Sequence, residues 1–376
     1  MEFSVFRQVL IRALGHMQSI VEKRATLPIL MNVKLEVGDD LILSATNVDL
    51  ELVEHVQADV TLGGKTTVPV QMLYEIVRKL KPDAEITFKQ SGDKLVVSSD
   101  RAVFHLPTLP AENFPAMAGS NLTTKFQMTT GDLAHLINQT KFAIPTDDVR
   151  YHLGGIYFHI SNDDGPSKLT AVATDAQRMA LCAMDAPAGS AEMPSVILPR
   201  RVIGELSKLL EDATVDDAMV ELSDTKARFS VGAATLTSKL VDAQYPNYRV
   251  VIPKGNDKIA ILDRGQFLNA VDLVSSASMD KTKSVQLTFS MNKLVVNSSS
   301  PDSASGSQEL DIEYNGDASF SVTFNVKFLM DVVGQVEGEK IQIEMQDSLS
   351  PTILKSTDKD TDALFILMPM HKMSEK

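Results

Sequence analysis

The feature that most constrains the fold of this 376-residue chain is an internal repeat with a period of about 130 residues. Val68-Pro69 stands before one helical pattern, and Leu198-Pro199 stands before a second one 130 positions later. Asn325-Val326 takes the third equivalent place, about 127 positions further on. The aromatic-proline pairs Phe114-Pro115 and Tyr245-Pro246 are 131 positions apart. Because independent landmarks recur at one spacing, we predict three tandem domains, at residues 1–124, 125–254 and 255–376.

Each repeat has the pattern of an α+β domain. Its opening segment ("FRQVLIRALGHMQSI", "GDLAHLINQTKFAI" or "DRGQFLNAVDLVSS") places apolar residues at the i, i+3, i+4, i+7 spacing of an amphipathic helix. Asp132 and Asp263 stand where helix N-caps belong. A second helical pattern follows in each repeat, and the remaining text alternates as strands do, with hairpin turns at 38–40 and 291–293. We expect two helices backed by antiparallel sheets in each domain.

Composition and motifs argue against an enzyme and against a membrane protein. The sequence has no P-loop, GxGxxG or HExxH motif, and its seven His residues lack metal-ligand spacing, so we expect neither a metal nor a cofactor. The lone Cys182 lies in an alternating strand pattern, which indicates a core position, and a single cysteine fits a reducing cytosol. No apolar run approaches the length of a membrane helix. A hydrolase using Asp147 or Asp148 is an alternative that lacks an assembled site.

Basic residues are concentrated in two segments of a chain whose formal net charge is −13. Residues 4–24 and 70–81 together hold seven basic residues against two acidic ones. An acidic protein can bind an anion locally through such segments. The same charges also fit solvated helix faces, and charge alone does not separate the two interpretations.

Several motifs, in order, resemble the family of bacterial sliding clamps, the β subunits of DNA polymerase III. They are "TLPIL" at 26–30 followed by "LSATNVDLE", "DVRYHLGG" at 148–155, "ATDAQRMA" at 173–180, "SKLVDAQYPNY" at 238–248 and the terminal "MPM" at 368–370. The resemblance covers essentially the whole chain. It implies three clamp domains that close into a ring as a head-to-tail homodimer, with helices lining the hole and no catalytic activity. The alternative is a repeat scaffold that binds only protein peptides, without DNA.

The resemblance also implies partners and a location. The partners are double-stranded DNA held without sequence preference, the catalytic subunit of DNA polymerase III, the clamp loader, and other polymerases and repair proteins with clamp-binding motifs. The location is cytoplasmic, with the nucleoid. Lys and Arg on lining helices suit such a ring, because contacts to phosphates hold DNA without reading its bases. The DNA-binding candidates are Arg24, Arg78, Lys79, Tyr151, His152, Arg200 and Arg201.

Two further sets of residues follow from the resemblance. The first is a hydrophobic pocket for partner peptides, where flexible Met side chains suit varied apolar guests: Leu153, Thr174, Arg178, Met179, Pro246, Val250, Val251, Asn325, Phe328, Leu349, Pro351, Ile366, Leu367, Met368, Pro369 and Met370. The second is the dimer interface, with Phe104 and Leu106 as apolar anchors and Lys94, Arg101, Asp302 and Glu309 as charges that set register.

The sequence departs from the family pattern at several of these positions. Ala176-Gln177 stands where family members often have Gly-His, and Val250 stands where many carry a second Arg. Thr282 replaces an occasional aromatic residue, Pro351 replaces a small polar one, and residues 371–376 run past the usual end. These changes leave the peptide preference of the pocket open.

Overall fold

The computed structural model describes residues 1–376 except 23, 118–120, 148, 163–164, 278–283, 300–303, 317, 359–361 and 371–376. The expectations that fall on Asp148, Thr282, Asp302 and the tail 371–376 therefore lie outside the described residues. The chain forms two compact units, one of residues 1–135 and 187–242, the other of residues 136–186 and 243–376. No helix in the described ranges is long and apolar enough to cross a membrane.

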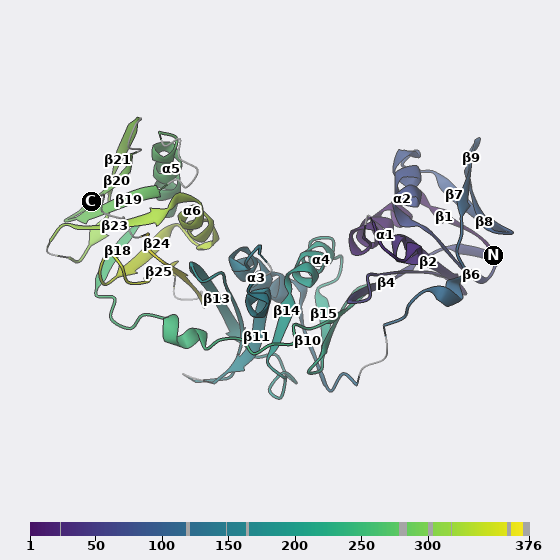
Figure 1. Ribbon diagram of the computed structural model, residues 1–376, viewed down its shortest axis with the longest axis horizontal. Helices are drawn as coiled ribbons and strands as arrows, with labels where there is room; N and C mark the ends of the chain where they lie inside the picture. The colour runs from purple at the N-terminus through teal and green to yellow at the C-terminus, as the bar shows by residue number, and fades with distance from the viewer. Residues whose placement is uncertain are drawn as a thin grey trace. The chain divides into compact units, whose positions relative to one another are not determined.

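The first unit holds two antiparallel sheets covered by helices (Figure 1). Its elements are β1 (Glu2–Phe6), α1 (Arg7–Ile20), η1 (Pro28–Met31), β2 (Asn32–Val37), β3 (Leu41–Thr46), β4 (Leu50–Val56), β5 (Asp59–Leu62), β6 (Gly64–Pro69), α2 (Val70–Lys79), β7 (Glu85–Ser91), β8 (Lys94–Ser99), β9 (Ala102–Pro107), η2 (Ala111–Asn113), β10 (Thr124–Thr129), β14 (Val196–Pro199), α4 (Arg200–Glu211), β15 (Asp217–Leu222), β16 (Lys226–Val231) and β17 (Ala234–Lys239). The strand orders are β5-β1-β7-β8-β9 and β10-β15-β16-β17-β4-β3-β2-β6.

The second unit repeats this arrangement. Helix α3 (Thr130–Thr140) leads into it, and its elements are η3 (Lys141–Ala143), η4 (Tyr151–Leu153), β11 (Gly155–Ser161), β12 (Lys168–Thr174), β13 (Arg178–Asp185), η5 (Tyr248–Val251), β18 (Lys258–Asp263), α5 (Arg264–Ser275), β19 (Ser284–Ser290), β20 (Lys293–Ser299), β21 (Ser305–Asp311), β22 (Glu313–Tyr314), β23 (Phe320–Asn325), α6 (Val326–Gln335), β24 (Lys340–Met345), β25 (Thr352–Ser356) and β26 (Ala363–Leu367). One sheet runs β11-β12-β13-β26-β25-β24-β18-β22, and the other runs β21-β20-β19-β23.

The cores form because helix stripes and strand alternation present apolar faces to each other. Helix α1 buries Leu10, Leu14 and Met17 at the predicted spacing and packs against α2 and the sheet of β3 and β4. Helix α5 likewise packs against α6. Strand β19 alternates buried and half-buried residues along its whole length. The threefold repeat is confirmed: each third of the chain contributes two strand-helix units and antiparallel strands.

Local signals at helix starts and turns were mostly correct. Asp263 caps α5 by accepting from the main-chain N–H of Gln266 at 2.7 Å. The N-cap prediction for Asp132 was wrong, because α3 begins two residues earlier and the Thr129 hydroxyl accepts from the Asp132 N–H at 2.9 Å. The predicted hairpin turn at 291–293 is confirmed, with Asn292 in the left-handed region at a φ of 58°.

The repeats are joined by pairing of strands at their edges. The third strand after the first helix of each repeat is β4, β13 or β21, and the last strand of each repeat is β9, β17 or β26. Strand β17 pairs with β4, from Ala234 opposite Glu54 to Ser238 opposite Leu50. Strand β26 pairs with β13 in the same antiparallel manner. Strands β9 and β21 remain as sheet edges within the described residues.

Candidate functional site

The apolar C-terminal strand is held in place on both sides. Strand β26 pairs with β13 and with β25, and the chain beyond it stays anchored because the Met368 N–H donates to the Gln177 carbonyl at 2.8 Å. The Met370 N–H donates to the Thr323 carbonyl at 2.7 Å. Met368 and Met370, both predicted pocket residues, are half-buried, so part of each side chain is accessible at the surface.

Several residues of the predicted pocket are buried. Ile366 and Leu367 are at most 1% exposed, and Met179 and Leu153 are buried as well. Ile366 and Leu367 follow the buried Phe365 at the end of β26, whose last three residues all lie in the core. Leu153 lies in η4 and Met179 in β13. Direct contact of these four side chains with a guest stays a prediction.

Arg178 is a buried cation at the centre of the pocket region. Its guanidinium contacts Asp175 at 3.1 Å and Asp331 at 2.5 Å, and donates to the Phe142 carbonyl at 2.9 Å. It also lies over the rings of Phe142 and Phe328, at 5.2 and 4.6 Å from their centroids. Since its donors are used inside the protein, Arg178 fixes β13 against α6 and shapes the pocket.

The turn before Arg178 carries the departure from the family pattern. The Asp175 carboxylate accepts from the N–H groups of Gln177 and Arg178, both at 2.9 Å, and Thr174 donates to the Arg178 carbonyl at 2.8 Å. Ala176 has a φ of +71°, a left-handed conformation that favours glycine. The turn therefore holds Ala176 in a backbone conformation that is strained for a residue with a Cβ atom.

The residues predicted for the rim of the pocket are apolar and exposed. Val250, Val251 and Leu349 are 77%, 43% and 55% exposed. Asp347 fixes the loop of Leu349 by accepting from the N–H groups of Leu349 and Ser350, and a hydrogen bond from the Ser350 hydroxyl is the main cause that lowers the pKa of Asp347. Pro246 is exposed, Pro369 is buried, and the remaining predicted members are half-buried: Thr174, Asn325, Phe328 and Pro351.

The predicted DNA-binding residues lie on the surfaces of both units. Arg78 and Lys79 occupy the last turn of α2, where Glu75 contacts Arg78 at 2.7 Å. Arg200 and Arg201 open α4 after Pro199, and Arg201 donates to the Ile20 carbonyl at 2.6 Å. Arg24, Arg78, Lys79, Arg200 and Arg201 are exposed, as is Tyr151, while its neighbour His152 is half-buried.

The predicted interface residues lie on or beside the two strands that end their sheets: Lys94 begins β8, Arg101 lies in the turn before β9, Phe104 and Leu106 lie on β9, and Glu309 lies on β21. Phe104 on β9 is half-buried, and Lys94 and Arg101 are exposed. Glu309 on β21 is exposed and contacts Lys293 at 2.6 Å. Leu106, predicted as an apolar anchor, is 1% exposed and lies in the core of its own domain, so its part in the interface stays a prediction.

Three models of the DNA polymerase III beta subunit match the chain in order. The N-terminal domain matches residues 1–118, the central domain 127–247 and the C-terminal domain 249–371. A beta sliding clamp of Caulobacter vibrioides is 40% identical over 375 residues, covering 98% of this chain and 100% of that protein. The chain belongs to the beta sliding clamp family.

Solved structures of sliding clamps agree with this assignment. Caulobacter crescentus pol III beta has a TM-score of 0.93 and 39% identity, covering 99% of this chain and 100% of that one. A DnaN sliding clamp from Bartonella birtlesii, solved bound to griselimycin, has a TM-score of 0.95 and 38% identity, covering 99% and 100%. The chain is thus a DNA sliding clamp, a processivity factor of replication.

An exposed leucine of the clamp escaped the sequence analysis. Leu273 on α5 is 66% exposed, and α5 packs against the edge strand β21. The sequence does carry an indication of this exposure, because Leu273 lies outside the buried apolar stripe of α5, which consists of Phe267, Ala270, Val271 and Val274. An off-stripe leucine beside an unpaired strand marks a candidate contact surface.

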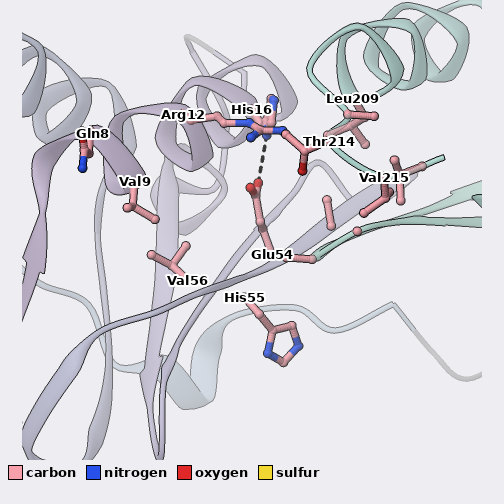
Figure 2. A pocket seen from close by; sticks show the side chains of 15 residues that line it. Gln8, Val9, Arg12, His16, Glu54, His55, Val56, Leu209, Thr214 and Val215 are labelled. Carbon is pink, nitrogen blue, oxygen red and sulfur yellow. Dashed lines mark hydrogen bonds and ion pairs between the residues drawn. The ribbon is translucent and has the colours of Figure 1, made fainter. Parts of the chain in front are cut away.

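The first two repeats of the clamp are also joined by a buried histidine, which no sequence pattern indicated. His16 on α1 contacts Glu54 of β4 at 2.9 Å and Asp212, just after α4, at 3.0 Å. Figure 2 shows Glu54 pointing at His16, to which it is bonded, beside a cavity of about 300 Å³ that both residues line, whereas His55 points away. Burial alone would lower the pKa of His16, but the hydrogen bonds and charges of the two carboxylates outweigh it and raise the pKa.

Two expectations about chemistry concern groups outside these surfaces. Cys182 is buried at 1% exposure, and burial raises the pKa of its thiol to about 12, so it is a core residue as predicted. In the part of the chain that the structure describes, no group of three His, Cys, Asp or Glu side chains is arranged to hold a metal.

Proposed function

We propose that this clamp acts as a closed ring of two chains, joined head to tail, that encircles duplex DNA and holds partner proteins in a hydrophobic peptide pocket. Six domains then form the ring, with boundaries near 124 and 254 in each chain. The ring supplies topology and attachment points and has no catalytic step of its own. Its place is the cytoplasm, with the nucleoid, where its DNA partner is found.

The observation that carries ring closure is the repeated edge join. The last strand of the second repeat, β17, pairs with β4 of the first, and the last strand of the third repeat, β26, pairs with β13 of the second. The same rule leaves β9 and β21 to pair between two chains. Unlike edges can meet only head to tail, and pairing covers both of them.

The side chains at these edges complement each other. Arg101 and Lys94 lie beside β9, and Glu309 lies on β21. The half-buried Phe104 and the exposed Leu273 supply apolar surface on the two sides of the proposed joint. Asp302 belongs to the same proposal from sequence alone.

Sedimentation tests the proposed dimer. At micromolar concentration we expect a mass of about 82 kDa, twice the 41.0 kDa of one chain. A species of 41.0 kDa under these conditions would contradict ring closure.

The proposed DNA contacts are made by charge and not by base recognition. Exposed Arg24, Arg78, Lys79, Arg200 and Arg201, with Tyr151 and His152, are the candidates for phosphate contacts. In the double variant Arg78→Gln, Lys79→Gln we expect weaker DNA binding by about the same factor on any sequence, and a shallower dependence of affinity on salt. A loss confined to one DNA sequence would count against sequence-independent binding.

The proposed peptide pocket is supported by the half-buried pair Met368 and Met370 and by the exposed rim of Val250, Val251 and Leu349. Candidate partners are the polymerase catalytic subunit, the clamp loader, and other polymerases and repair proteins. Replacing Met368 and Met370 with Ala should weaken binding of a partner peptide by about 1–3 kcal/mol, read by fluorescence anisotropy. Unchanged affinity would mean that the pocket lies elsewhere.

A further inference from the structure

A second groove lies beside η5, whose residues Tyr248 and Arg249 line it. Its floor is one face of the sheet of β11, β12 and β13, and its wall is the segment 248–254. Its volume is about 590 Å³, and it is lined by Ser161, Pro166, Lys168, Thr170, Leu181, Ala183, Tyr248, Arg249, Ile252 and Lys254. That volume lies within the range of clefts that bind small ligands and short peptide segments.

Strand alternation gives this groove a mixed floor. Leu181 and Ala183 on β13 face it, while Cys182 between them faces the core at 1% exposure. Thr170 bonds to Ser161 through their hydroxyls at 2.8 Å, which uses polar groups of the floor within the protein. The remaining floor is apolar and suits an aliphatic chain better than a phosphate backbone.

The rim of the groove is cationic. The side chains of Lys168, Arg249 and Lys254 line it, and no carboxylate is among the described residues that do so. Lys168 donates a hydrogen bond to Asp362, which is the main cause that raises its pKa, so part of its charge is compensated. Arg249 lies over the ring of Tyr248 at 5.2 Å, and Tyr248 is held by His159 at 2.9 Å. Lys254 is exposed at the end of the wall.

The groove and the proposed peptide pocket share one helical turn. Tyr248 and Arg249 of η5 line the groove, and Val250 and Val251 of the same turn belong to the predicted pocket rim. The residues that flank a peptide seated on the pocket are therefore the candidates to reach the groove. The net charge of the chain is −13, but the rim of this groove is cationic. At the groove, acidic residues of a bound peptide are therefore favoured over neutral or basic ones.

We infer that this groove is an accessory subsite that binds acidic residues flanking the apolar segment of a partner peptide. The inference rests on the proposed pocket and adds a determinant of which partners bind well. The pocket supplies apolar contacts that many partners share, and the groove ranks those partners by the charge beside them.

The test uses fluorescent peptides and the full-length clamp. One core peptide carries Leu and Phe for the pocket, and it is extended at either end by Asp-Glu-Asp-Glu, by Asn-Gln-Asn-Gln or by Lys-Arg-Lys-Arg. We expect the better-placed acidic extension to bind about three- to tenfold tighter than the amide one at low salt, with the gap closing as salt rises. In Lys254→Glu the order should reverse, so that the basic extension binds tighter than the acidic one.

Controls separate the groove from general charge effects and from failure of the pocket. Lys89→Glu makes the same charge change on β7 of the first unit and should keep the acidic preference. Equal affinity for acidic and amide peptides, or an acidic preference that survives Lys254→Glu, would overturn the inference and leave the pocket intact. Absence of binding by every peptide would overturn the proposed pocket itself. A thymidine oligonucleotide that displaces only the acidic peptide would assign the groove to nucleic acid and overturn the inference.

Discussion

At the scale of single residues, two ionisable side chains that this clamp buries, Arg178 and His16, are each surrounded by partners. Arg178 is 8% exposed, yet two carboxylates, one carbonyl and two aromatic rings contact it. His16 is 7% exposed and lies between two carboxylates. Removing one member of such a group leaves another charge buried without compensation, which costs more than the pair itself contributes.

The strained turn at Ala176 gives a prediction about stability. Because a left-handed conformation costs a residue with a Cβ roughly 1–2 kcal/mol, glycine relieves that strain and loses part of the gain to its more flexible unfolded state. We expect Ala176→Gly to raise the free energy of unfolding by about 0.5–1 kcal/mol in thermal or urea denaturation. Ala183→Gly, in strand β13, is the contrasting control and should destabilise the clamp. A destabilising Ala176→Gly would contradict the assigned backbone conformation.

The raised pKa of His16 gives a prediction about pH. A group whose folded pKa is raised stabilises the fold fully below its unfolded value of 6.5 and loses that contribution as pH rises through the folded value. The Tm advantage of the natural clamp over His16→Gln should therefore be larger at pH 6 than at pH 9. His55→Gln, an exposed neighbour of Glu54 on β4, should show no such trend. An advantage that grows with pH would contradict the protonated bridge.

At the scale of secondary-structure elements, the recurring device is an edge strand that continues its neighbour's sheet. The two joins within the chain use β17 with β4 and β26 with β13. Unpaired edges promote association with other chains, and a defined partner edge turns that tendency into a specific contact.

The third join can be tested through its apolar side chains. We expect Phe104→Ala and Leu273→Ala each to raise the dissociation constant of the dimer about tenfold, as truncation of an interface anchor does. If the two side chains touch, the double variant should lose less than the two single effects combined. Analytical ultracentrifugation over a dilution series gives these constants. Met291→Ala, at an exposed hairpin turn, is the control. If Phe104→Ala and Leu273→Ala change the dissociation constant no more than this control does, the two side chains are not part of the interface.

Sequence patterns predicted the elements better than their contacts. The repeat landmarks and helix stripes were sufficient for the threefold fold, because each depends on residues close in the chain. Alternation along β9 grouped Phe104 with Leu106 but did not show that Leu106 is buried in its own domain. Asp132 was predicted as the N-cap, but Thr129, three positions earlier, takes that role by accepting from the Asp132 N–H. Both residue types are good caps, so the sequence alone does not separate them.

Contacts between distant segments were beyond those patterns. His16 and Asp212 are separated by 196 positions, and nothing in either local sequence indicates the other. The floor of the second groove likewise depends on which face of β13 turns outward. The predicted pocket positions came from family resemblance. Resemblance names positions in the sequence, but it does not indicate that the side chains of Ile366 and Leu367 are buried.

At the scale of the whole molecule, an acidic protein that works on DNA must confine its attraction to one surface. The net charge of −13 opposes general adhesion to DNA, and the proposed function assigns the local attraction that remains to the exposed Arg and Lys of α2 and α4. A ring needs no tight contact with DNA, because closure alone keeps the two together. Topology, not affinity, is therefore the property that the account assigns to this clamp.

Retention on circular and linear DNA tests that property most directly. The clamp is loaded by its clamp loader onto a labelled nicked circle, the free protein is removed, and half of the sample is cut once. The account predicts that the clamp stays on the circle and leaves the linear DNA by sliding off its ends. Equal retention on the two forms would contradict encirclement.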